Sequence, residues 1–109
     1  MNTKLTEKKC TVCEVGGAAL VESGISTLIK ELGGGWEVHD AKMIMKTFSF
    51  PDFKQTMVFV NKVADVAEEE GHHPDMRVSW GKVIIELTTH AVKGLSENDF
   101  ILAAKIDRL

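Results

Sequence analysis

The segment from Asp52 to Glu70 constrains the fold most, because it is the longest stretch with one unbroken periodicity. It follows Pro51 and ends at Gly71, residues that are typical of the start and the end of a helix. Its apolar side chains recur at helical spacing and form one wide stripe. They are Phe53, Met57, Val60, Ala64 and Ala67, with Phe59, Val63 and Val66 beside them. The sequence therefore predicts a long amphipathic helix that must pack against another layer.

Segments with the character of β-strands flank this helix in pairs. Before it, "WEVH" at 36–39 and "KMIMKTFSF" at 42–50 are rich in β-branched and aromatic residues. After it, apolar residues alternate along 76–80 and again along 83–87. The sequence thus predicts two hairpins joined by the long helix.

Two further helices complete the order. The helical spacing in "ESGISTLIKEL" ends at Gly33, and Ser96 with Asp99 forms a capping box that opens a helix near the carboxyl end. The order α-β-β-α-β-β-α predicts an α+β, two-layer fold with a four-stranded antiparallel sheet and three helices on one face. The 109 residues are expected to form a single domain, residues 1–109, in which 1–20 is an N-terminal arm.

The second hairpin predicts which residues face each other. A turn at Gly81-Lys82 pairs Trp80 with Val83 and places the alternating apolar residues of both strands on one core face. The same register, continued to the open end, sets His73 opposite His90 on the other face. We therefore expect His73 and His90 to converge, with His72 beside them.

Composition and charge exclude several classes of function. The net charge is -3 and the basic residues are scattered, which argues against a nucleic-acid partner. Neither a membrane span nor a secretory signal is evident, so a cytoplasmic location without membrane contact is expected. Cys10 and Cys13 have the spacing of a zinc ligand pair or a redox disulfide, but each site lacks its other half. We interpret them as reduced thiols in the arm.

The string "EGHHPD" places adjacent histidines between Gly71 and Pro74, directly after three glutamates. Negative charge in the last turn of a helix opposes the macrodipole, and such local conflicts are common at functional sites. A carboxylate beside a histidine stabilises the protonated imidazole and assists acid-base catalysis. Glu68 is the candidate for this role, whereas Glu69 and Glu70 are expected to form a solvated face.

The string "E-EEG-HHP-DMRVS-W-GKVIIELTT-H-AVKGLSEN-D", from Glu68 to Asp99, resembles the signature of the pterin-4a-carbinolamine dehydratases, also known as dimerisation cofactors of a homeodomain factor. Upstream, Trp36, "FSFPDFKQTMVFVNKVA" and the "CxxC…GG" start extend the similarity over essentially the whole chain, as in many bacterial members. The resemblance implies a hydro-lyase that eliminates water from 4a-hydroxytetrahydropterin to give quinonoid dihydropterin, which recycles the pterin after aromatic amino acid hydroxylation.

The resemblance also implies which residues form the site. It makes His72, His73 and His90 catalytic, with His72 and His90 as the acid-base pair, and it requires neither metal nor redox cofactor. Residues expected to line or support the pterin site are Glu68, Pro74, Trp36 and Asp99. Family members form dimers or dimers of dimers, so a homodimer or homotetramer is expected, along with a functional link to an aromatic amino acid hydroxylase.

Other interpretations remain open at this level. A mononuclear metal enzyme could use the three histidines with Asp75. A non-catalytic interaction or assembly protein could use the same fold, although relatives adapted in that way tend to lose the histidine set that this chain retains. The natural substrate could also be a different pterin.

Overall fold

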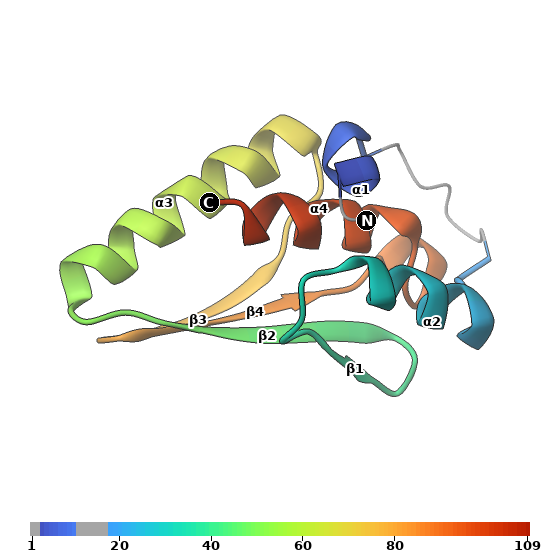
Figure 1. Ribbon diagram of the computed structural model, residues 1–109, viewed down its shortest axis with the longest axis horizontal. Coiled ribbons are helices and arrows are strands. Elements are labelled where there is room, and N and C mark those ends of the chain that lie inside the picture. Colours follow the sequence, from blue (N-terminus) through green and yellow to red (C-terminus); the bar gives the residue numbers. More distant parts are fainter. Residues whose placement is uncertain (1–2, 11–17) are drawn as a thin grey trace.

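A computed structural model describes residues 3–10 and 18–109 of the chain. Within these residues it contains four α-helices, one short 3₁₀ helix and one four-stranded sheet (Figure 1). The helices are α1 (Thr3–Glu7), α2 (Glu22–Glu31), α3 (Phe53–Glu70) and α4 (Glu97–Asp107), with the 3₁₀ helix η1 at His90–Val92. The strands are β1 (Glu37–His39), β2 (Met43–Ser49), β3 (Asp75–Ser79) and β4 (Lys82–Leu87). The predicted α+β order from α2 onward is confirmed.

All neighbouring strands pair antiparallel, and the spatial order is β1-β2-β4-β3. The two hairpins therefore meet along β2 and β4, which leaves β1 and β3 as the edges. Figure 1 shows α2, α3 and α4 together on one side of this sheet, as predicted for a two-layer fold. No helix in the described part of the chain is long and apolar enough to cross a bilayer.

Helix α4 lies at the centre of the helical layer, which its amphipathic spacing does not reveal. Nearly every residue from Asn98 to Ala104 is buried, including Phe100 and Leu102. It contacts α1, α2 and α3, so it is enclosed by helices as well as by the sheet. Val83, Ile85 and Leu87 on β4 form the facing side of this core and are fully buried. A polar side chain near the start of α4 is therefore held in a rigid environment.

Both ends of α3 follow the sequence signals. The Asp52 carboxylate accepts a hydrogen bond from the Gln55 backbone N–H at 2.8 Å, which caps the first turn. At the other end, Gly71 adopts the left-handed conformation with φ 67°, which glycine allows at little cost. The chain thus leaves α3 in a sharp turn that leads directly to His72.

The predicted register of the second hairpin is wrong by two residues. Val78 pairs with Val83 and Met76 with Ile85, so the loop is Trp80-Gly81 between the paired residues Ser79 and Lys82. Val78 and Met76 keep the predicted parity, but Trp80 leaves the core face and is 65% exposed. Alternation fixes a face but not which partner sits opposite, because a shift of two residues preserves the face.

Gly81 is required for a reason other than the predicted type II′ turn. It does not have a positive φ. Its backbone lies against that of Phe50, directly after β2: the Gly81 carbonyl accepts a hydrogen bond from the Phe50 N–H at 2.8 Å. A Cβ at Gly81 would come within 2.9 Å of the Phe50 carbonyl oxygen. Close approach of two backbones, rather than the turn type, selects glycine here.

The predicted N-terminal arm contains a helix that the sequence reasoning did not anticipate. Helix α1 packs against α4 (Figure 1). Its Leu5 side chain is 1% exposed and belongs to the main core. Cys10 follows it and is half-buried with a free thiol. Cys13 lies outside the described residues. Residues 3–10 are thus an integral part of the helical layer, and we call them the N-terminal strap.

Candidate active site

The turn after α3 separates the two adjacent histidines. Gly71 and His72 donate their backbone N–H groups to the Ala67 carbonyl, which closes the helix end. Pro74 then precedes β3 and favours an extended backbone at His73. As a result, His72 is mostly buried against α4, whereas the His73 side chain is exposed.

His72 is held by a buried carboxylate. Its Nε2 lies 2.7 Å from Oδ1 of Asp99, a side chain that is 0% exposed in the first turn of α4. Because a carboxylate accepts hydrogen bonds, this contact directs the Nε2 hydrogen toward Asp99. The other ring nitrogen, Nδ1, then carries the lone pair. An imidazole fixed in this way is suited to proton transfer, since its orientation and tautomer are set in advance.

The Asp99 carboxylate also completes the predicted capping box. Its Oδ2 accepts from the Ser96 backbone N–H at 3.0 Å and from the Thr89 hydroxyl at 2.8 Å. The Thr89 and Ser96 hydroxyl oxygens are 2.7 Å apart. The structural interpretation of Asp99 is therefore confirmed, and the same carboxylate also contacts His72. Thr89 was not singled out from the sequence, where only its position beside His90 draws attention to it.

His73 meets the first of the three glutamates. Its Nε2 contacts Oε2 of Glu68, and both side chains are exposed to solvent. The contact spans the helix end, with Glu68 in the last turn of α3 and His73 beyond Gly71. Glu68 is therefore the glutamate of this turn that reaches a histidine, as its selection from the sequence supposed.

His90 is not placed by the expected cross-strand pairing. It begins η1 and is exposed, immediately after Thr89, whose hydroxyl binds Asp99. His73 precedes β3, so His73 and His90 are not cross-strand partners. Asp99 contacts His72 and Thr89, so it links His72 to the residue directly before His90.

Trp36 is placed away from the Asp99 carboxylate. It is buried in the core, and its Nε1 donates to Oδ2 of Asp107 at 3.0 Å. Asp107 ends α4 whereas Asp99 lies in its first turn, which separates them by about 12 Å along the helix axis. The structure thus brings Glu68, Pro74 and Asp99 to the His72–His73 turn, and it seats Trp36 at the other end of α4.

Glu70 differs most from its expected place. The prediction of a solvated face is wrong for this residue, because its side chain is only 2% exposed and its Oε2 lies 2.6 Å from Nζ of Lys105. Its Oε1 accepts from the Cys10 backbone N–H at 2.9 Å. Glu69, in contrast, is exposed as predicted. The missing signal was Lys105, a cation that directly follows the apolar run 100–104 of α4.

The partners of Glu70 determine its ionisation. Burial by itself raises the pKa of the Glu70 carboxyl, but hydrogen bonds from Lys105 and from Cys10, together with the charges of Lys105 and Lys9, outweigh it. The pKa is therefore lowered from its ordinary value of 4.5. The same surroundings act on Cys10, whose pKa is raised to about 12 by burial first and by the charge of Glu70 next.

The metal-enzyme interpretation needs several ligands in one place. Within residues 3–10 and 18–109, no three histidine, cysteine, aspartate or glutamate side chains cluster closely enough to hold a metal ion. Asp75, the acidic ligand considered with the histidines, lies on β3 opposite Glu86.

The fold and the site define a class: an α+β protein with a helix-covered antiparallel sheet and a carboxylate-anchored histidine beside a second histidine–carboxylate pair. Residues 18–109 match the family model described as pterin 4 alpha carbinolamine dehydratase. The chain belongs to this family, which confirms the resemblance noted from the sequence.

Relatives and solved structures agree with this assignment. Proteins carrying the family's name in Rickettsia bellii and Nitrosomonas eutropha are 49% and 50% identical, over 96% of this chain and 93% and 92% of theirs. A transcriptional coactivator/pterin dehydratase from Brucella melitensis superposes with a TM-score of 0.77 at 31% identity, over 83% of this chain and 96% of that one. A pterin dehydratase-like protein identified as a RuBisCO assembly factor of the alpha-carboxysome gives 0.60 at 27%, over 70% and 89%.

Proposed function

We propose that this protein eliminates water from 4a-hydroxytetrahydropterin to give quinonoid dihydropterin, by histidine acid-base catalysis that needs neither metal nor redox cofactor. Family membership supports the reaction class. The observation that carries the histidine mechanism is the 2.7 Å contact between His72 and the buried Asp99 carboxylate. It fixes the orientation of one imidazole at the start of α4.

The elimination needs two proton transfers. The C4a–O bond breaks as an acid protonates the departing hydroxyl, and a base removes the proton from the neighbouring ring nitrogen, which forms the carbon–nitrogen double bond. His72 suits the base, because its Nε2–H donates a hydrogen bond to Asp99 and its Nδ1 lone pair is then left for the substrate proton. In this scheme His90 is the acid that releases the hydroxyl as water.

The remaining site residues support binding and orientation. In this scheme His73, which contacts Glu68, aligns the pterin ring. Pro74 limits the backbone before β3 and keeps His72 and His73 directed apart. Trp36 belongs to the proposed pterin site by family resemblance, although its hydrogen bond to Asp107 gives it a packing role in the core.

The test is a dehydration assay on the purified protein with and without a chelator. Wild-type protein should accelerate dehydration equally in both conditions, and His72→Ala and His90→Ala should each lower the rate by about 10² to 10⁴. The double variant should lose much less than the product of the single losses, since the two groups act in one step. His39→Ala, which changes a histidine outside the site, is the matched control and should retain full activity.

Two results would contradict the proposal. If a chelator abolished the activity and a metal restored it, the metal-enzyme interpretation would be favoured. If the losses of the two single variants multiplied in the double variant, His72 and His90 would act in separate steps. A protein that is folded but inactive on every pterin tested would favour an assembly role, which the likeness to the alpha-carboxysome assembly factor raises. Comparing several 4a-hydroxypterins tests whether tetrahydrobiopterin recycling for an aromatic amino acid hydroxylase is the natural task.

A further inference from the structure

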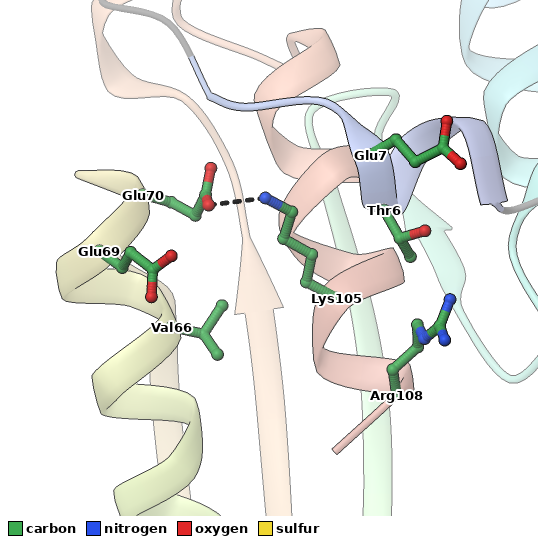
Figure 2. Close-up of a pocket in the computed structure, with 7 residues that line it drawn as sticks. All are labelled: Thr6, Glu7, Val66, Glu69, Glu70, Lys105 and Arg108. Carbon is green, nitrogen blue, oxygen red and sulfur yellow. Dashed lines mark hydrogen bonds and ion pairs between the residues drawn. The ribbon is translucent and has the colours of Figure 1, made fainter.

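Two residues on either side of Gly71 are tied to the same helix. Glu70 pairs with Lys105 at 2.6 Å, and His72 pairs with Asp99 at 2.7 Å. Lys105 and Asp99 are six residues apart on α4, so the two ties lie about 9 Å apart along its axis. Figure 2 shows the Lys105 side chain reaching across from α4 to Glu70 at the end of α3.

The Glu70 carboxylate is buried, and each of its two oxygens accepts a hydrogen bond. Its Oε2 binds Lys105 and its Oε1 accepts from the Cys10 backbone N–H, which brings in the N-terminal strap. The Cys10 thiol in turn donates to the Asn98 carbonyl at 3.6 Å, one residue before Asp99. Glu70 therefore links α3, α4 and the strap at the point where the chain turns toward His72.

A cavity of about 410 Å³ lies beside this junction. The strap contributes Thr6 and Glu7 to its wall, and Arg108 and Lys105 approach from α4 (Figure 2). Because the cavity flanks the ion pair, the pair contributes to the spacing between α3 and α4 at this end. A buried carboxylate in the last turn of a helix opposes the macrodipole, so its retention here calls for such a role.

We propose that Glu70 is a positioning residue, which sets His72 against Asp99 by anchoring the end of α3 to Lys105. Glu70 can control the position of His72 because only Gly71 lies between them. Gly71 has no side chain and sits in the left-handed region at φ 67°, so it can also adopt other conformations. When Glu70 is held by Lys105 and His72 by Asp99, only Gly71 separates the two held residues. The backbone of His72 then has little conformational freedom. Without the anchor, the turn can rotate about Gly71 and carry the imidazole away from Asp99.

The experiment compares Glu70→Gln with Glu69→Gln, an exposed neighbour in the same helical turn that serves as a matched control. The first readout is independent of activity: the His72 imidazole nitrogen signals in long-range ¹H–¹⁵N spectra of the full-length protein. Glu70→Gln should shift or broaden these signals, whereas Glu69→Gln should leave them as in the wild type. Lys105→Arg, which keeps the charge, should stay closer to the wild type than Lys105→Met.

The second readout rests on the proposed function. Glu70→Gln should lower kcat on the order of tenfold to a hundredfold, while KM changes less than about twofold, because a misplaced catalytic group impairs the reacting geometry more than binding. A merely structural role would lower the amount of folded protein and leave the kcat per folded molecule and the His72 signals unchanged. That pattern would overturn the inference.

The two readouts separate failure of this inference from failure of the proposed function. If the wild type has no dehydratase activity, the His72 spectra still decide whether Glu70 positions the ring. If Glu70→Gln does not fold, Glu70→Asp is the second variant, since it keeps the charge and shortens the side chain by one methylene. It should displace the His72 signals in the same way, and wild-type signals in a folded Glu70→Asp protein would overturn the inference.

Discussion

At the residue scale, Asp99 performs two tasks with one carboxylate. Its Oδ2 closes the capping box at Ser96, while its Oδ1 holds His72. Capping alone would tolerate a water-exposed carboxylate, but here the group is fully buried. The capping pattern could therefore be recognised from the sequence, whereas the contact with His72 depends on where α3 ends relative to α4.

The thiol of Cys10 allows a direct test of the environment around the contact between Glu70, Lys105 and Cys10. Burial raises the pKa of its thiol to about 12, so the reactive thiolate is scarce near neutral pH. In a Cys13→Ser background, where Cys10 is the only thiol, alkylation at about pH 8 should be roughly 10³-fold slower in the folded than in the unfolded protein. Labelling kinetics followed by mass spectrometry give this ratio. Equal rates would mean that Cys10 is not buried in the folded protein.

At the element scale, the last turn of α3 divides its three glutamates among different tasks. Glu68 contacts His73, Glu69 faces solvent, and Glu70 enters the junction with Lys105. The three are consecutive, so a helix must direct them about 100° apart, and they cannot share one environment. The sequence shows the conflict with the macrodipole, but the prediction that both Glu69 and Glu70 face solvent holds only for Glu69.

Glu70 should give the protein a specific sensitivity to acid. The pKa of its carboxyl is lowered in the folded state, so its stabilisation is fully present above the ordinary value of 4.5 and is lost as the pH falls through the lower, folded-state pKa. The free energy of unfolding of the wild type should therefore fall more steeply below 4.5 than that of Glu70→Gln. At neutral pH, Glu70→Gln should be less stable by about 3 kcal/mol, because Lys105 loses its partner.

Urea denaturation at several values between about pH 7 and about pH 3 measures both effects. Glu69→Gln is again the control, and its curve should run parallel to that of the wild type because Glu69 is exposed. Parallel curves for wild type and Glu70→Gln across this range would show that the Glu70–Lys105 pair adds nothing to stability.

At the scale of the whole molecule, the sheet has two open edges and an uneven apolar surface. The edge strand β3 exposes Val78, and Trp80 beside it is 65% exposed. Helix α3 exposes Phe53 and Val58 on the side away from the core. Unpaired strand edges and large exposed apolar side chains are typical of surfaces that are covered by a partner.

We expect a second copy of the chain to cover part of this surface. Light scattering at micromolar concentration should give a mass near two or four times the 12.0 kDa of the chain. Trp80→Ser or Val78→Lys should lower that mass if β3 takes part, whereas Lys54→Ser, a polar change near the start of α3, should leave it unchanged. A wild-type protein that is monomeric under these conditions would refute the prediction.

The sequence by itself determined the main elements and the family. Periodicity located α2, α3, α4 and both hairpins, because side-chain spacing along the chain reflects which face of an element is buried. Capping residues defined the ends of α3 and the start of α4, since they satisfy backbone groups locally. The histidine pattern led to the family for the same reason: its spacing is written directly in the chain.

Tertiary structure alone decided what depends on contacts between distant residues. It set the order β1-β2-β4-β3 and the pairing of Val78 with Val83, which alternation cannot distinguish from a register two residues away. It also brought Lys105 and the strap to Glu70, and Asp99 to His72. Local sequence carries no signal for these pairs, because the charges that neutralise a buried carboxylate lie on other elements and meet it only when the helices pack.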